Sequence, residues 1–161
     1  RWADDPALHA EVTRDHVMVF RNAGPVGGPG MPEWGMLPIP RKLLAEGVRD
    51  MIRISDCRMS GTSYGACILH AAPEAFVGGP LALLRTGDRV KLDIPAGRLD
   101  LVIPADELAA RRAAWTPPEF ENLTPWQKIY RDHAGPLSTG GCLEFATQIR
   151  RTSARLPRHN H

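Results

Sequence analysis

Cysteine, aromatic residues and net charge are all scarce in this sequence of 161 residues. The three cysteines, Cys57, Cys67 and Cys142, are widely spaced and form no Cys-x-x-Cys pair, which argues against a disulfide framework or a structural zinc site. Lysine and arginine number 20 against 18 acidic residues, so the chain lacks the field that attracts nucleic acid. The absence of a long apolar run or a signal-peptide pattern predicts a cytoplasmic protein without membrane contact.

Glycine and proline are abundant instead, with 15 of each, while 43% of the residues are hydrophobic. That apolar fraction is too high for a disordered chain, so the excess is expected in the turns of one folded domain. Residues 146–161 form a basic C-terminal tail with four arginines and no acidic residue. Such a tail can touch phosphates, although a solvated chain end has the same composition.

Hydrophobic patterns and turn signals predict short strands that alternate with short helices. The expected strands are Val17–Arg21, Val48–Ser55 and a hairpin around Pro95–Arg98, and the expected helices are Arg41–Gly47, about Gly61–His70, a segment opening at Asp106, and one capped by Thr124. This pattern favours an α+β domain, with a β-barrel-like sheet and peripheral helices.

Ser60 is the first candidate for a catalytic residue. If a helix begins just after it, its hydroxyl oxygen lies at the positive helix end beside free backbone amides, an environment that favours an oxyanion. Serine is also a favoured N-cap, so a purely structural role is equally compatible with this position. The surrounding pattern is not G-x-S-x-G, which argues against the nucleophile elbow of a hydrolase.

Glu33 is the second candidate, in the Gly/Pro-rich loop Asn22–Gly35. Glycines there permit close backbone approach and prolines stiffen the loop, so a carboxylate held in it suits a hard cation such as Mg²⁺. A solvent-exposed loop glutamate is the alternative. The loop lacks the ending of a P-loop, which argues against a phosphate cradle.

Two segments, NAGPVGGPGMPEWGMLPIP at residues 22–40 and RISDCRMSGTSYG at residues 53–65, carry a family resemblance. Together with LHAAPEA and GGPLALLRTGD, which follow them, they resemble the C-terminal domain of the dihydroxy-acid and phosphogluconate dehydratases. The closing stretch KIYRDHAGPLSTGGCLEF is similar to the sugar-acid members, such as arabinonate or xylonate dehydratases, more than to the enzyme of branched-chain amino-acid biosynthesis.

The resemblance implies a β-barrel domain similar to the swivelling domain of aconitase-like enzymes. It also implies a hydro-lyase that removes water from a 2,3-dihydroxy acid to give a 2-keto-3-deoxy acid. In that chemistry Ser60, of the R-M-S-G-T motif, is the base for the C2 proton. Glu33, of G-M-P-E, is one Mg²⁺ ligand, and Thr62 binds the substrate.

The same resemblance implies that residues 1–161 are one C-terminal domain of a larger dehydratase. The ligands of an iron–sulfur cluster and the remaining Mg²⁺ ligands would lie in an N-terminal domain, so we expect the domain alone to be inactive and the whole enzyme to be a homo-oligomer. The alternative is a stand-alone barrel that acts as a non-catalytic binding or assembly module.

Overall fold

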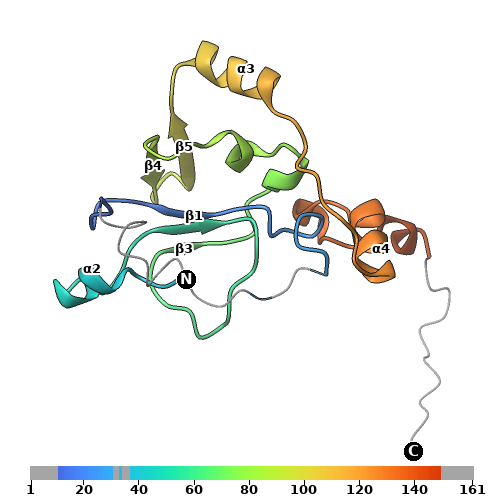
Figure 1. The fold of residues 1–161 in the computed structure, drawn as a ribbon, viewed down its shortest axis with the longest axis horizontal. Helices are drawn as coiled ribbons and strands as arrows, with labels where there is room; N and C mark the ends of the chain where they lie inside the picture. The colour runs from blue at the N-terminus through green and yellow to red at the C-terminus, as the bar shows by residue number, and fades with distance from the viewer. Residues whose placement is uncertain (1–10, 31–32, 34–36, 150–161) are drawn as a thin grey trace, which may run out of the picture.

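The computed structural model describes residues 11–30, 33 and 37–149 of the chain. At its centre lies a three-stranded parallel sheet in the order β1-β2-β3 (Figure 1). Its strands are β1 (Met18–Phe20), β2 (Arg53–Ser55) and β3 (Cys67–Ile68). All three residues of the central strand β2 are buried. The loop that follows β2 therefore begins at a strand held within the core.

Apolar side chains pack into two clusters around this sheet. The first contains Met18, Ile39, Leu43, Val48 and Met51, and the second contains Ile54, Ala75 and Leu81. Helix α2 (Arg41–Ala45) supplies Leu43 to the first cluster and ends before Gly47, whose φ of 84° is a left-handed value that glycine adopts readily. The helix expected at this place is therefore confirmed.

The hairpin of β4 (Arg89–Asp93) and β5 (Arg98–Val102) forms a second, antiparallel sheet, as predicted from its alternating pattern. Helix α3 (Ala105–Ala114) follows it, and both stand to one side of the central sheet (Figure 1). Arg111 fastens α3 to the chain before the hairpin, because its guanidinium donates to Asp88 at 2.8 Å and to the Leu83 carbonyl at 2.9 Å.

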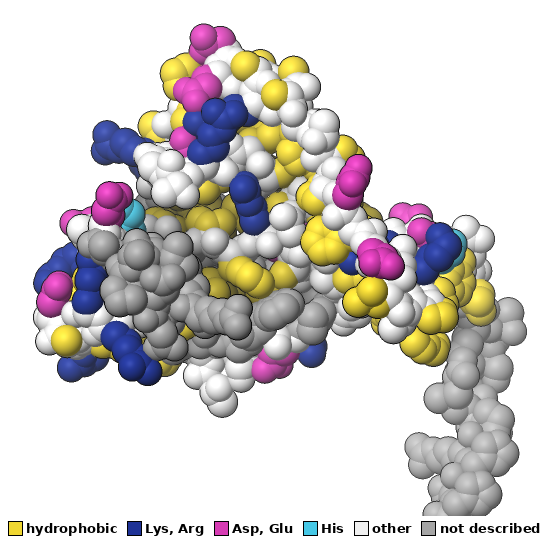
Figure 2. All heavy atoms as spheres, in the orientation of Figure 1, with side chains coloured by type: hydrophobic (Ala, Val, Ile, Leu, Met, Phe, Trp, Pro, Cys, Tyr) yellow, Lys and Arg dark blue, Asp and Glu magenta, His cyan; other side chains and the backbone are white. Residues whose placement is uncertain are grey.

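The last third of the chain carries α4 (Pro125–His133) and α5 (Glu144–Thr147), neither of which has a buried residue. Thr124 caps α4 as predicted, because its hydroxyl accepts from the Gln127 N–H at 3.2 Å. Hydrophobic side chains gather over this part of the surface (Figure 2). Short 3-10 turns complete the fold: η2 (Ala75–Val77), η3 (Pro80–Leu83) and η4 (Leu137–Thr139).

Two sequence predictions are corrected. The strand expected over Val48–Ser55 is confined to Arg53–Ser55, and no helix occupies Gly61–His70. Residues 60–63 form a turn instead, and Cys67–Ile68 pair with β2, because side-chain hydrogen bonds and strand pairing outweigh a short run of weak helix formers.

The fold is a small mixed α/β arrangement of two sheets and helices. The described residues contain no closed barrel, so that part of the expected fold is not confirmed. In the same residues no helix has the length and apolarity to cross a bilayer. Most of the basic tail lies outside the described ranges.

Candidate functional site

Ser60 and Thr62 lie together in the loop of residues 56–66, which leaves the end of β2 and returns as β3. The Thr62 N–H donates to Ser60 Oγ at 3.2 Å, and the two hydroxyl oxygens are 2.9 Å apart. The Ser63 N–H closes the turn on the Ser60 carbonyl at 2.9 Å. The structure thus brings two of the three predicted site residues into direct contact.

The environment of Ser60 differs from the one predicted, because no helix begins after it and no helix dipole acts on its oxygen. The Thr62 N–H takes that place by donating to Ser60 Oγ, and the two hydroxyls share a second hydrogen bond in which either oxygen can donate. Hydrogen bonds to an oxygen favour its anionic form. The half-buried Ser60 beside the exposed Thr62 can therefore exchange a proton with a molecule bound at this surface.

Glu33 is exposed, and its backbone forms a parallel β-bridge with Arg58, two residues before Ser60. The segment carrying the predicted metal ligand therefore lies beside the segment carrying the predicted base. A single exposed carboxylate fits one position of a Mg²⁺ shell, which takes few protein ligands alongside water and substrate. Among the described residues no group of three or more His, Cys, Asp or Glu could complete a metal site.

Asp56 holds the start of the Gly/Pro-rich loop. Its carboxylate is fully buried and accepts from the N–H groups of Asn22, Ala23 and Ala75, at 3.0, 3.1 and 2.8 Å. Burying a charge is costly unless hydrogen bonds compensate it, and three such bonds do so here. The carboxylate ties the loop before Glu33 to the end of β2, just before the Ser60 turn.

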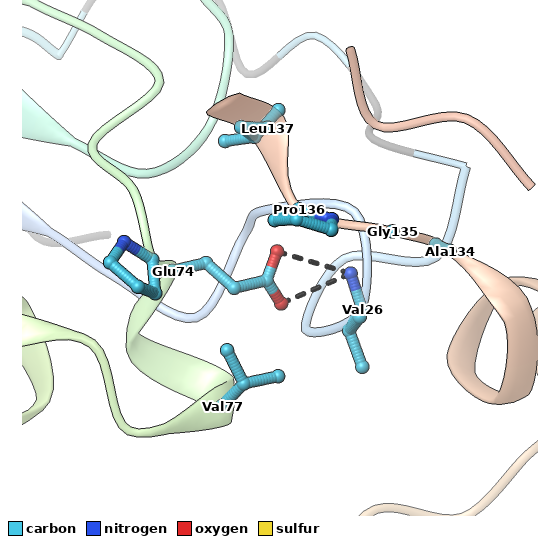
Figure 3. A pocket seen from close by; sticks show the side chains of 8 residues that line it. Val26, Glu74, Val77, Ala134, Gly135, Pro136 and Leu137 are labelled. Atoms are coloured by element: carbon cyan, nitrogen blue, oxygen red, sulfur yellow. Dashed lines mark hydrogen bonds between the residues drawn. The ribbon is translucent and has the colours of Figure 1, made fainter. Parts of the chain in front are cut away.

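Glu74 holds the next part of the same loop. Its carboxylate accepts from the Val26 N–H at 3.0 Å (Figure 3) and from the Gly27 N–H at 2.7 Å. Burial raises the pKa of this carboxyl, although the N–H donors act in the opposite direction. Gly24 has to be glycine, because a Cβ there would run into the Glu74 side chain.

The Glu74 side chain also borders a cavity of about 150 Å³ (Figure 3). Its other walls come from the loop, from η2 and from the chain after α4: Val26, Pro73, Val77, Ala134, Gly135, Pro136 and Leu137. The carboxylate points toward the Val26 amide, to which it is hydrogen-bonded. Glu74 is therefore a support of the loop.

The cysteines do not fit an iron–sulfur cluster. Cys57 is fully buried, and burial raises the pKa of its thiol, which disfavours the thiolate that metals bind. Cys67 lies on β3, not on the predicted helix, and Cys142 is exposed near the C-terminal end of the described residues. No step through a cluster can be built from this chain's own thiols.

Asp56 and Glu74 were missed as site-supporting residues by the sequence reasoning, and so was the fully buried Arg53. A signal for the two acids was present, since a loop rich in glycine exposes many backbone N–H groups that need acceptors. The position of Asp56 directly after a buried strand pointed to it as one acceptor. For Arg53 nothing in the local pattern separates it from a surface arginine.

Residues 3–141 match the family model described as the C-terminal domain of the dihydroxy-acid/6-phosphogluconate dehydratases. The chain belongs to this family. It is 56% identical over 145 residues to 6-deoxy-6-sulfo-D-gluconate dehydratase of Pseudomonas putida, covering 90% of this chain and 25% of the relative.

Two further relatives span the sugar-acid and dihydroxy-acid branches. D-xylonate dehydratase of Caulobacter vibrioides is 43% identical over 98% of this chain and 26% of its own length. Dihydroxy-acid dehydratase of Acidothermus cellulolyticus is 48% identical over 85% of this chain and 25% of its own length. The chain thus spans about a quarter of the length of the curated relatives it matches.

Proposed function

We propose that this chain is the C-terminal part of a hydro-lyase that dehydrates a sugar acid to a 2-keto-3-deoxy acid. The observation that carries the proposal is the Ser60–Thr62 pair beside the Glu33 bridge, in a chain of the dehydratase family. A half-buried serine oxygen that accepts from the Thr62 N–H and shares a hydrogen bond with the Thr62 hydroxyl, with an exposed carboxylate on the neighbouring segment, suits abstraction of a proton next to a carboxylate group.

Each of the three site residues has a separate role in the proposed reaction. Ser60 Oγ, as the alkoxide, takes the proton from C2 of the substrate and becomes the neutral hydroxyl, while the negative charge moves to the substrate. Before the transfer, the Thr62 N–H and hydroxyl stabilise the charge on the alkoxide oxygen. Glu33 would hold one position in the coordination shell of a Mg²⁺ ion. When bound, such an ion offsets the negative charge that develops on the substrate oxygens. The remaining ligands, and any iron–sulfur cluster, would come from the rest of a longer protein.

The substrate class we propose is a sugar acid. Support comes from the names of the similar proteins, among them 6-deoxy-6-sulfo-D-gluconate, D-xylonate and L-arabonate dehydratases. Similarity to dihydroxy-acid dehydratases keeps a branched aliphatic acid as the competing substrate. Parallel assays of these acids with the full-length protein distinguish the two classes.

The test of the proposed base is Ser60→Ala in the full-length protein. Loss of a general base lowers turnover by roughly 10²- to 10⁴-fold, so formation of the 2-keto-3-deoxy product and exchange of the C2 hydrogen should both fall by that factor. The exposed Ser138 supplies a matched control, and Ser138→Ala should leave both rates unchanged. Retained exchange in Ser60→Ala would instead favour a non-catalytic role for the domain.

The test of the proposed metal ligand is Glu33→Gln. Removing one carboxylate ligand should raise the Mg²⁺ concentration needed for half-maximal activity by roughly ten-fold or more. Glu46→Gln, at an exposed position at the end of α2, is the control. An unchanged Mg²⁺ requirement would remove Glu33 from the metal shell.

A further inference from the structure

Arg53 lies fully buried at the base of the loop that carries Ser60 and Thr62. Its guanidinium donates to the Tyr64 carbonyl at 2.8 Å, and its charge lies 5.7 Å from the Tyr64 ring. Its own backbone pairs with the far limb of the loop, since the Arg53 N–H donates to the Ala66 carbonyl at 2.9 Å. Arg53 therefore holds the returning limb of the loop, at residues 64–66, against β2.

Asp50 completes this connection from the other side. Its carboxylate pairs with the Arg53 guanidinium and accepts from the Ala66 N–H at 2.9 Å. Gly65 packs so closely on Asp50 that a Cβ at that glycine would clash with the carboxylate. The Asp50 side chain is 41% exposed, whereas the Arg53 side chain has no exposed surface, so Asp50 is the solvent-facing half of the pair.

Arg53 also reaches toward the segment that carries Glu33. Its guanidinium donates to the Leu37 carbonyl at 3.5 Å, four residues after Glu33, while Tyr64 lies four residues after Ser60. One buried planar group with several donors in a fixed fork thus contacts both segments of the candidate site. Lysine has the same charge but cannot present that fork.

We propose that Arg53 and Asp50 are positioning residues, which set Ser60 and Thr62 at the distance from Glu33 that proton abstraction requires. The inference rests on the proposed function of these three site residues. Neither residue has to touch the substrate. A displacement of about 1 Å at a reacting group can cost 10²-fold in rate, so a small relaxation of the loop is enough to slow the reaction.

The experiment compares Arg53→Lys with unmodified full-length protein, using 6-deoxy-6-sulfo-D-gluconate with hydrogen or deuterium at C2. We expect kcat to fall roughly 10- to 100-fold with a smaller change in KM. The isotope effect on kcat should rise, because the proton transfer becomes slower relative to the other steps. Arg98→Ala, at an exposed arginine on β5, is the matched control and should change neither quantity.

A purely structural role gives a different result. Loss of folded protein would lower the apparent kcat in proportion to the active fraction, while KM and the isotope effect of the remaining molecules stay unchanged. That result, or an unaltered kcat, would overturn the proposal. If Arg53→Lys does not fold, Asp50→Asn provides the same comparison, because it keeps the shape of the side chain and weakens its bonds to Arg53 and Ala66.

The Ser60→Ala variant separates this inference from the proposed function. If Ser60→Ala abolishes C2 exchange while Arg53→Lys and Asp50→Asn behave like the unmodified protein, only the positioning role fails. If Ser60→Ala retains exchange, the serine is not the base and the positioning role fails together with it.

Discussion

The central sheet with its two loops and the C-terminal segment of residues 119–149 are held in place by different means. Around the sheet, buried charged side chains bind the backbone: Asp56 and Glu74 accept from loop N–H groups, and Arg53 donates to carbonyls. In the C-terminal segment no helix has a buried residue. Its connections to the rest of the chain include Arg131, whose guanidinium lies 5.8 Å from the Phe76 ring and donates to the Val26 carbonyl at 3.4 Å, and the Phe120 ring, which lies 5.3 Å from that of Phe76.

This difference predicts which substitutions will destabilise the whole domain and which will destabilise only one helix. A buried carboxylate that serves three N–H groups cannot lose its bonds without unfolding its surroundings, because water cannot replace it. A helix such as α4 depends on its cap and on the exposed Lys128–Asp132 pair at 2.7 Å. Such a helix can open alone, since little apolar surface binds it to the core.

The largest effect is expected from Asp56→Ala. Three backbone N–H groups would remain buried without an acceptor, at a cost of about 3 kcal/mol or more in the free energy of unfolding. Urea unfolding of the chain measures this change. Asp132→Ala removes an exposed carboxylate of α4 and should leave the urea midpoint unaltered. Equal effects of the two substitutions would contradict the distinction between the regions.

A second comparison uses two glycines with nearly the same backbone angle. Gly65 has a φ of 83° and Gly47 a φ of 84°, but only Gly65 faces a close neighbour, the Asp50 carboxylate. Gly47→Ala should cost about 1 kcal/mol for the left-handed conformation alone. Gly65→Ala should cost about 1 to 3 kcal/mol more, because the added Cβ displaces Asp50. Similar unfolding midpoints for both variants would show that the loop relaxes freely.

A smaller, pH-dependent effect on stability is expected at the ion pair between Asp88 and Arg111 of α3. Hydrogen bonding to Arg111 lowers the pKa of Asp88 to about 2, below its ordinary value of 3.8. A carboxyl with a depressed pKa contributes stability above its ordinary pKa, and that contribution is lost as the pH falls through the depressed value. The midpoint temperature of thermal unfolding should therefore change less between pH 4 and pH 2 for Asp88→Asn than for the unmodified chain. An equal dependence of the two midpoints on pH would contradict the contribution of the ion pair.

The elements that sequence reasoning predicted correctly are those set by local signals. The hairpin around Gly97, helix α3 and the Thr124 cap each depend on residues within a few positions of one another. The helix expected after Ser60 was wrong because pairing with β2, a tertiary contact, determines that segment. Ser60, Thr62 and Glu33 were singled out from motifs, whereas the support from Arg53 depends on segments that only folding brings together.

The smallest global effect is expected from Thr124→Ala. Loss of an N-cap costs about 1 kcal/mol in helix stability, because the Gln127 N–H loses its acceptor. Since α4 buries no side chain, that cost should appear as local opening. Amide hydrogen exchange within residues 125–133 should become roughly five-fold faster, while exchange at the β2 amides and the urea midpoint remain unchanged. If β2 exchange accelerates equally, α4 unfolds with the core, and the C-terminal segment belongs to the same cooperative unit as the site.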